Sequence, residues 1–162
     1  MVAGAQWEAQ REDCFMRTMM LIGFGLATCL PAMTFAASTA PVPGERALRE
    51  ECSAFSQAGM RDCLAKNAQD SQKALRNIEE EAVSALSRWD EESRYVSQAK
   101  AKLAASNREF SRYRDSQCEF SASLSGGGAG NAHEIRRLAC VSEFNNRRAE
   151  QLRDAVSDLP RK

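Results

Sequence analysis

The stretch that decides the fold is Phe110-Ser111-Arg112-Tyr113-Arg114-Asp115-Ser116-Gln117-Cys118, together with Cys140 beyond a glycine-rich break. The break reads Gly-Gly-Gly-Ala-Gly-Asn at residues 126–131, and no helix would tolerate so many glycines. Residues on both sides of the break recur at helical spacing. The sequence therefore predicts a helical hairpin that carries one cysteine on each helix.

The rest of the chain has an all-helical composition. No proline occurs between Pro43 and Pro160, and alanine, glutamate, arginine, glutamine and leucine dominate the interval. Apolar residues also recur along the chain every three or four residues, which is the period of an α-helix. Apolar stripes of this period need partner helices to bury them, so the sequence predicts an all-α fold: a small bundle of three long helices with a short one before them. Three stripes step by three and four residues: Leu75, Ile78, Ala82, Leu86 and Trp89; Val96, Ala99, Leu103, Ser106, Phe110, Tyr113 and Gln117; and Leu138, Val141, Asn145, Arg148, Leu152, Val156 and Leu159.

The helix ends are less clearly marked than the stripes. Ser56 can cap a helix over residues 60–87, because its hydroxyl can accept from an unpaired amide of the first turn. The polar run at residues 90–94 indicates a turn or kink. One long bent helix is the alternative, since no glycine or proline marks the run.

Residues 1–36 have the features of a leader with a cleaved signal peptide. An apolar run begins at Met19 after an arginine, and small residues surround Ala36, where a signal peptidase would cut. The first fifteen residues include three carboxylates, unlike the start of a signal peptide, so Met16 is the favoured translation start. A transmembrane anchor is the main alternative, disfavoured by Pro31 and by the shortness of the apolar run.

Cleavage after the leader defines the predicted domain plan. Lipidation of Cys29 is a further alternative, although the threonine before it is a poor match to a lipoprotein signal. Residues 37–44 are small and contain two prolines, which predicts a flexible lead-in. A single helical domain is expected over residues 45–159.

The mature chain keeps four cysteines: Cys52, Cys63, Cys118 and Cys140. An even number of cysteines in a small exported domain indicates two disulfides in an oxidising compartment. Buried free thiols are the alternative.

The register of the hairpin supports the pairing of Cys118 with Cys140. If these cysteines face each other on antiparallel helices, Phe110 lies opposite Arg148 and Tyr113 lies opposite Asn145. The disulfide thus aligns two stripes that were found independently of it.

The remaining two cysteines need a turn between them. Eleven residues of continuous helix would separate Cys52 and Cys63 by about 16 Å, whereas bridged Cα atoms lie about 6 Å apart. Residues 56–59 can supply the turn, so the local pairing is favoured. Pairing of Cys52 with Cys118 or Cys140 is the alternative.

Several classes of function are disfavoured. Basic and acidic residues number 22 each, and the balance stays near neutral without the leader, so nucleic acid binding has no electrostatic basis. The single histidine, His133, has no nucleophile at a recognisable spacing, so no catalytic residue and no enzyme activity are expected. The cysteines lack the short spacing of metal sites, and no metal or other cofactor is expected.

The hairpin resembles a known family. Its identities and spacings match the pattern W-x-x-Y-R-D-x-x-C, a glycine-rich loop, and C-x4-T-x-x-R-x3-L of the lysozyme inhibitor LprI family of exported bacterial proteins. Three residues differ: Phe110 replaces the family tryptophan, Asn107 an upstream glutamine, and Asn145 the threonine. The matching positions are Tyr113, Arg114, Asp115, Cys118, residues 126–130, Cys140, Arg148 and Leu152.

The resemblance implies a periplasmic or secreted protein that binds and inhibits lysozyme, with no membrane span after signal cleavage. A non-inhibitory envelope structural or interaction module is the alternative, and Trp89, Tyr95, Phe120 and Phe144 are the aromatics that could remain exposed for it. The motif residues are interpreted as structural. Arg148, for example, needs a partner for its guanidinium, such as the Phe110 ring or a neighbouring carboxylate.

The loop at residues 125–133 is the candidate partner-binding element. It is rich in backbone and carries Gly127, Asn131 and His133. Because lysozymes are commonly basic, the acidic runs at residues 79–81 and 90–92 could instead steer the encounter.

Overall fold

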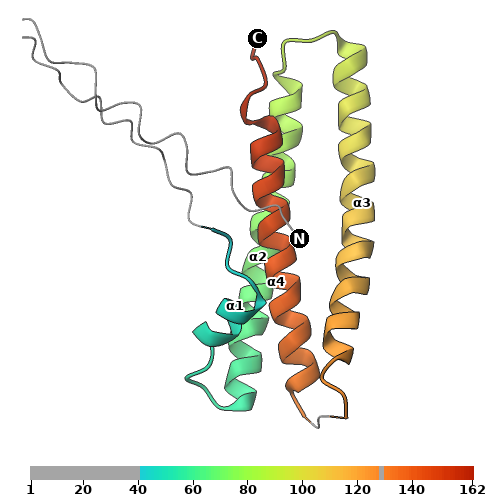
Figure 1. Ribbon diagram of the computed structural model, residues 1–162. Helices are drawn as coiled ribbons and strands as arrows, with labels where there is room; N and C mark the ends of the chain where they lie inside the picture. The colour runs from blue at the N-terminus through green and yellow to red at the C-terminus, as the bar shows by residue number, and fades with distance from the viewer. Residues whose placement is uncertain (1–40, 128–129) are drawn as a thin grey trace, which may run out of the picture. The chain divides into compact units, whose positions relative to one another are not determined.

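The computed structural model describes residues 41–127 and 130–162, and the predicted leader lies outside these residues. The described chain contains α1 (Glu45–Glu51), α2 (Gln57–Ser87), α3 (Ser93–Ser123) and α4 (Ala132–Ser157) (Figure 1). The predicted all-α class, with three long helices after a short one, is confirmed. None of these helices is long and apolar enough to cross a bilayer.

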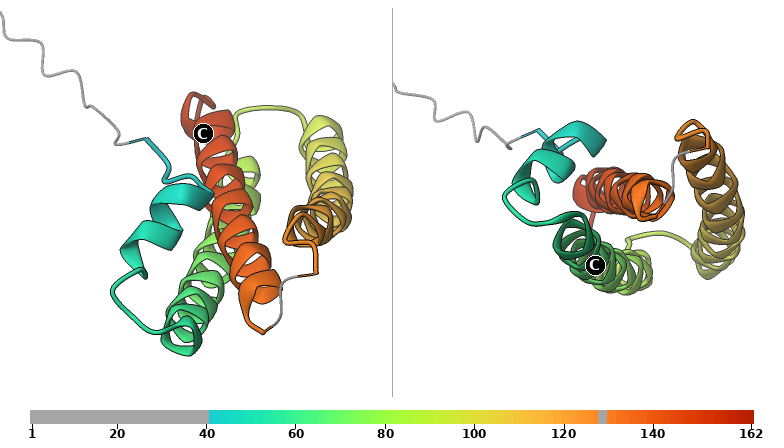
Figure 2. Two further views of the ribbon diagram at one scale, coloured as in Figure 1. Left: turned by 60° about the horizontal axis from the view of Figure 1, so that its bottom comes forward. Right: turned by 90° about the horizontal axis from the view of Figure 1, so that it is seen from below.

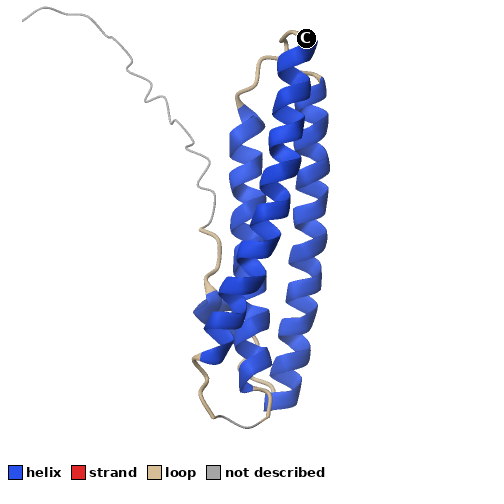
Figure 3. Ribbon diagram, turned by 90° about the vertical axis from the view of Figure 1, so that its right-hand side faces the viewer, coloured by secondary structure: helices blue, strands red, loops and turns tan. Residues whose placement is uncertain are grey.

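Helix α4 is the centre of the bundle. It packs against each of the other three helices, most extensively against α2, whereas α3 packs mainly on α4. The end-on view in Figure 2 shows α4 between α1 and α3, and Figure 3 shows the three long helices running alongside one another. Accordingly α4 has buried residues on several faces, while α3 buries only Cys118 and Ala122.

The core has two apolar clusters with a polar layer between them. Ser71 of α2 and Ser142 and Asn145 of α4 are the buried polar residues, and they fall between the two clusters along both helices. One cluster lies at the α1 end: Leu48, Cys52, Leu64, Ala68, Ile135, Leu138 and Ala139. The other contains Leu75, Ile78, Ala149 and Leu152, with Leu103 and Phe110 packed against it.

The structure settles the start of α2 and the run at residues 90–94, which the sequence marked less clearly. The Ser56 hydroxyl accepts from the amide of Gly59 at 3.3 Å, and α2 begins at Gln57, one turn before the expected start. The polar run after α2 is a turn rather than a helix interior. The C-terminal segment holds it there, because the amide of Asp90 donates to the carbonyl of Pro160 at 2.9 Å.

Two disulfides join the helices. Cys118 of α3 is bonded to Cys140 of α4 with Cα atoms 5.5 Å apart, so the predicted stapled hairpin is confirmed. Cys52 is bonded to Cys63 with Cα atoms 5.9 Å apart, which ties the end of α1 to the first turns of α2.

The predicted stripe on α3 is wrong in its central part. Tyr113, expected on the buried side, is 59% exposed, and Ser106 is exposed as well. Arg114 points inward instead, with a side chain that is only 12% exposed. Since successive residues are 100° apart, the face that includes Phe110 and Cys118 continues through Arg114 and leaves Tyr113 outside it.

Candidate functional site

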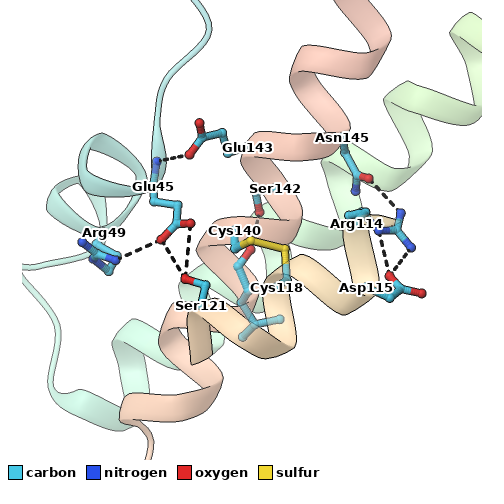
Figure 4. The surroundings of a disulfide bond; sticks show 11 residues. Glu45, Arg49, Arg114, Asp115, Cys118, Ser121, Cys140, Ser142, Glu143 and Asn145 are labelled. Atoms are coloured by element: carbon cyan, nitrogen blue, oxygen red, sulfur yellow. Dashed lines mark hydrogen bonds and ion pairs between the residues drawn. A yellow bond between two sulfur atoms is a disulfide. The ribbon is translucent and has the colours of Figure 1, made fainter. Parts of the chain in front are cut away.

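The Arg114 guanidinium connects three helices near the disulfide, and Figure 4 shows its bonds to Asp115 and Asn145. Its Nη1 donates to Gln72 Oε1 of α2 at 2.6 Å and to Asn145 Oδ1 of α4 at 2.8 Å. Its Nε and Nη2 both donate to Asp115 Oδ1, at 2.9 and 2.8 Å. The nearly buried charge of Arg114 is therefore paired with Asp115, and each of its three guanidinium nitrogens donates a hydrogen bond. A buried charge needs such partners.

Asn145 completes the polar layer. It is fully buried, accepts from Arg114, and donates through Nδ2 to Ser71 Oγ at 3.1 Å. Ser71 Oγ in turn donates to the carbonyl of Ala68 at 2.9 Å. This chain of bonds fixes the register of α2, α3 and α4, because a slip of any helix would leave buried polar atoms unpaired.

Arg148 lies one turn further along α4 in a different setting. Its Nη2 donates to Ser106 Oγ at 2.8 Å and to Asn107 Oδ1 at 3.0 Å, and its Cζ lies 5.5 Å from the centre of the Phe110 ring. Its Nε is buried and, within the described residues, has no hydrogen-bond partner. Burial lowers the pKa of Arg148, and the nearby carboxylate of Glu79 opposes that shift.

The other motif residues contact the same hairpin. The Phe110 ring lies close to two guanidiniums, those of Arg148 and Arg114, and the Arg114 Cζ is 6.0 Å from its centre. The Tyr113 ring packs edge-on against Phe144 of α4, with centroids 5.7 Å apart. Leu152 is 5% exposed in the second apolar cluster. These contacts support the interpretation of the motif as scaffold.

The candidate partner-binding residues gather at one end of the hairpin. Gly126 and Gly130 have φ angles of 61° and 83°, in the left-handed region that favours glycine. A Cβ at either position, or at Gly127, would meet nothing within 4 Å, so this part of the loop projects into open space. Asn131 precedes α4 and is half-buried, and His133 is exposed in its first turn.

The structure does not bring the loop and the acidic runs together. Residues 79–81 lie in the C-terminal half of α2, and residues 90–92 form the α2–α3 turn at the opposite end of the bundle from the loop (Figure 1). Glu79 is half-buried, and burial raises its pKa against the opposing charges of Arg148 and Arg114. The inward position of Glu79 makes it poorly suited to steer a partner.

Sequence reasoning missed several contributors to the site. Gln72 and Ser71 of α2 carry no motif, although Ser71 falls between Ala68 and Leu75 on the buried face of its helix, which is the signal that could have found it. Of the four aromatics named as candidates for exposure, Tyr95 and Phe120 are exposed, and Trp89 and Phe144 are half-buried. Within the described residues, no three histidine, cysteine or acidic side chains gather as a metal site would require.

Fold and site together define a small helical-bundle protein whose last two helices are joined by a disulfide and a buried arginine–asparagine layer. The model of the family described as Lysozyme inhibitor LprI matches residues 49–152, from the end of α1 to the last turns of α4. The chain belongs to this family. No curated protein matches the chain, and no solved structure does.

Proposed function

We propose that this protein is an exported lysozyme inhibitor that acts by binding lysozyme and performs no chemistry of its own. The family match over residues 49–152 carries the proposal, because it includes all four cysteines of the described chain and the hairpin of α3 and α4 as far as Leu152. Two disulfides in a small domain suit the periplasm or the extracellular space. The predicted signal peptide agrees with export.

The absence of an enzymatic role is part of the proposal. Cys52, Cys63, Cys118 and Cys140 are oxidised and cannot act as thiolate nucleophiles. His133 is exposed at the start of α4, and no orienting carboxylate is bonded to it within the described residues. A binding role needs no such groups.

We call the end of the hairpin that carries Gly127, Asn131 and His133 the loop end. It suits the chemistry of a lysozyme cleft, which uses two carboxylates. Carboxylates accept hydrogen bonds from N–H groups, and glycines present backbone amides that no side chain shields. Gly127 is exposed, with open space where a side chain would stand, and Asn131 and His133 add side chains that can donate hydrogen bonds. We propose that this end of the hairpin occupies the cleft and excludes the substrate.

A direct assay tests the function. The exported protein, purified with both disulfides intact, is added at micromolar concentration to c-type, g-type and i-type lysozymes acting on cell walls. Inhibition of at least one type is expected, with the fully reduced protein as the control. Lysozyme binding without inhibition would favour the non-inhibitory interaction module. If the protein neither binds nor inhibits any of the three types, the proposal is overturned.

A further inference from the structure

The two disulfides differ in their access to solvent. Cys118 and Cys140 are both fully buried, so the bond between α3 and α4 is enclosed by the bundle. Cys52 is fully buried as well, whereas its partner Cys63 on α2 is only half-buried. Because a thiol in solution must reach one sulfur atom before it can exchange with a disulfide, the bond between Cys52 and Cys63 is the more accessible of the two.

Cys52 is suited to leave when its bond to Cys63 is attacked. The side chain of Asn67, one turn after Cys63 on α2, donates through Nδ2 to Cys52 Sγ at 3.9 Å. A donor at this atom stabilises the thiolate that forms when the bond breaks, and a more stable leaving thiolate speeds the exchange. Glu50 and Glu51 precede Cys52 in the chain, but both are exposed, so water and salt screen their charges.

Helix α1 depends on this disulfide for its position. It has seven residues, and an isolated helix shorter than about 12 residues is marginal in water. Cys52 holds its C-terminal end, and the amide of Glu45 holds its N-terminal end by donating to Glu143 Oε2 of α4 at 2.7 Å. Leu48 is the buried residue between these anchors. Reduction of the disulfide would therefore release one end of α1 and leave the other attached.

The apolar cluster beneath α1 includes the first turns of α4. Leu48 and Cys52 belong to the same cluster as three residues from these turns, Ile135, Leu138 and Ala139. The loop end is attached to the same turns, and Figure 1 shows α1 in the half of the bundle that carries the loop. Loosening of α1 therefore removes support from the residues that hold the loop end in place.

We infer that the disulfide between Cys52 and Cys63 is a redox-sensitive clasp that supports the loop end. An external dithiol is the reductant. One of its thiolates attacks Cys63 Sγ, the bond between the two protein sulfurs breaks, and Cys52 leaves as a thiolate that takes up a proton. The second thiolate of the reductant then attacks the mixed disulfide, so that Cys63 is released, takes up a proton, and the dithiol becomes a disulfide.

The bond between Cys118 and Cys140 stays oxidised throughout, so the hairpin keeps its register while α1 loosens. The existence of the clasp is independent of any partner. Its effect on lysozyme binding rests on the proposed function, and it adds a redox control of the loop end to that function.

The first experiment measures which disulfide is reduced first. The full oxidised protein is treated with dithiothreitol without denaturant, free thiols are blocked with iodoacetamide, and the blocked cysteines are located by mass spectrometry. Cys52 and Cys63 should be labelled at least about tenfold faster than Cys118 and Cys140. In concentrated urea, where burial is lost, the two pairs should react at similar rates. Equal rates without urea, or earlier labelling of the hairpin pair, would overturn the clasp.

The second experiment measures what the open clasp does. Cys52→Ala with Cys63→Ala keeps the hairpin disulfide, and Cys118→Ala with Cys140→Ala is the matched control. In the first variant, amide hydrogen exchange should quicken in α1 and the first turns of α4, whereas in the control it should quicken along α3. The dissociation constant for the inhibited lysozyme should rise about fivefold or more in the first variant, because a looser loop end loses more conformational entropy on binding.

The outcomes separate the two proposals. If the wild-type protein binds no lysozyme, the proposed function fails, while thiol labelling and hydrogen exchange still decide whether the clasp exists. If the wild type binds and the open-clasp variant binds equally well, the proposed function stands, and the clasp's support of the loop end is overturned. Unchanged hydrogen exchange in the first turns of α4 would overturn it as well.

Discussion

Arg114 and Arg148 belong to the two arms of one stapled hairpin, yet their surroundings differ. Arg114 donates from Nε, Nη1 and Nη2 to acceptors on α2, α3 and α4. Arg148 contacts Ser106, Asn107 and the Phe110 ring, all on α3, and its buried Nε has no partner among the described residues. A buried guanidinium therefore fixes a bundle when its acceptors come from several helices, and it contributes less when they come from one.

The largest expected effect is at Arg114. Arg114→Met would leave the acceptors on Gln72 and Asn145 unpaired inside the bundle. We expect the free energy of unfolding to fall by about 3 kcal/mol, as when one partner of a buried polar network is removed. Urea unfolding followed by circular dichroism measures it. The control is Arg112→Met, whose exposed ion pair should be worth less than about 1 kcal/mol. Equal losses in the two variants would contradict the role of Arg114.

The second test concerns the hydrogen bond that Arg114 donates to residue 145, and it compares a threonine with a valine at that position. Asn145→Thr introduces the residue of the family motif and keeps a group that can accept from Arg114. Asn145→Val has nearly the same shape without that group. Asn145→Val should be less stable than Asn145→Thr by about 1–2 kcal/mol, the usual cost of a buried unsatisfied polar group. The same urea titrations measure the difference, and equal stabilities would show that the layer does not depend on this hydrogen bond.

The unpartnered Nε of Arg148 allows a smaller change in the opposite direction, a gain in stability. Asn107→Gln lengthens a side chain that already accepts from Arg148 and gives its oxygen reach toward Nε. We expect a gain in stability of about 0.5–1 kcal/mol. A double-mutant cycle with Arg148→Met isolates this term, because the gain should vanish when the guanidinium is absent. A gain that persists in the Arg148→Met background would assign it to another cause.

The contrast between the two arginines also marks how far the sequence could predict the site. The cysteine register placed Phe110 opposite Arg148, and their cation–π contact agrees with it. The same periodicity assigned Tyr113 to the interior, because steps of three and four residues from Phe110 fit either Tyr113 or Arg114, and an aromatic is the usual interior choice. Burial of Arg114 depends on acceptors on α2 and α4, which local spacing cannot reveal.

The helix ends show the same limit. Ser56 was recognisable as a cap because its partner Gly59 is three residues away. The turn after α2 depends on bonds from residues some seventy positions further along the chain: the amide of Asp90 donates to Pro160, and the amide of Lys162 donates to Arg88. Local patterns therefore predicted the class of fold and the disulfide hairpin, while long-range polar contacts decided the details.

The smallest expected effect is a pH dependence of the free energy of unfolding, caused by Glu79, whose carboxylate interacts with both arginines. Burial raises the pKa of Glu79 above its ordinary value of 4.5, although Arg148 and Arg114 oppose the shift. Between the unfolded and folded pKa values, the folded protein binds more protons than the unfolded chain. The free energy of unfolding attributable to Glu79 therefore decreases as pH rises through this window.

Glu79→Gln removes that contribution, so the variant should gain stability relative to the wild type as pH rises from about 4.5. The difference between their thermal unfolding temperatures isolates Glu79, because Glu134 and other carboxyl groups titrate alike in both proteins. Hydrogen bonding to Arg137 lowers the pKa of Glu134, which acts in the opposite direction. Glu80→Gln, at the neighbouring exposed position, is the control. If both variants change the pH profile equally, the effect comes from the acidic run as a whole and not from the buried position of Glu79 near the two arginines.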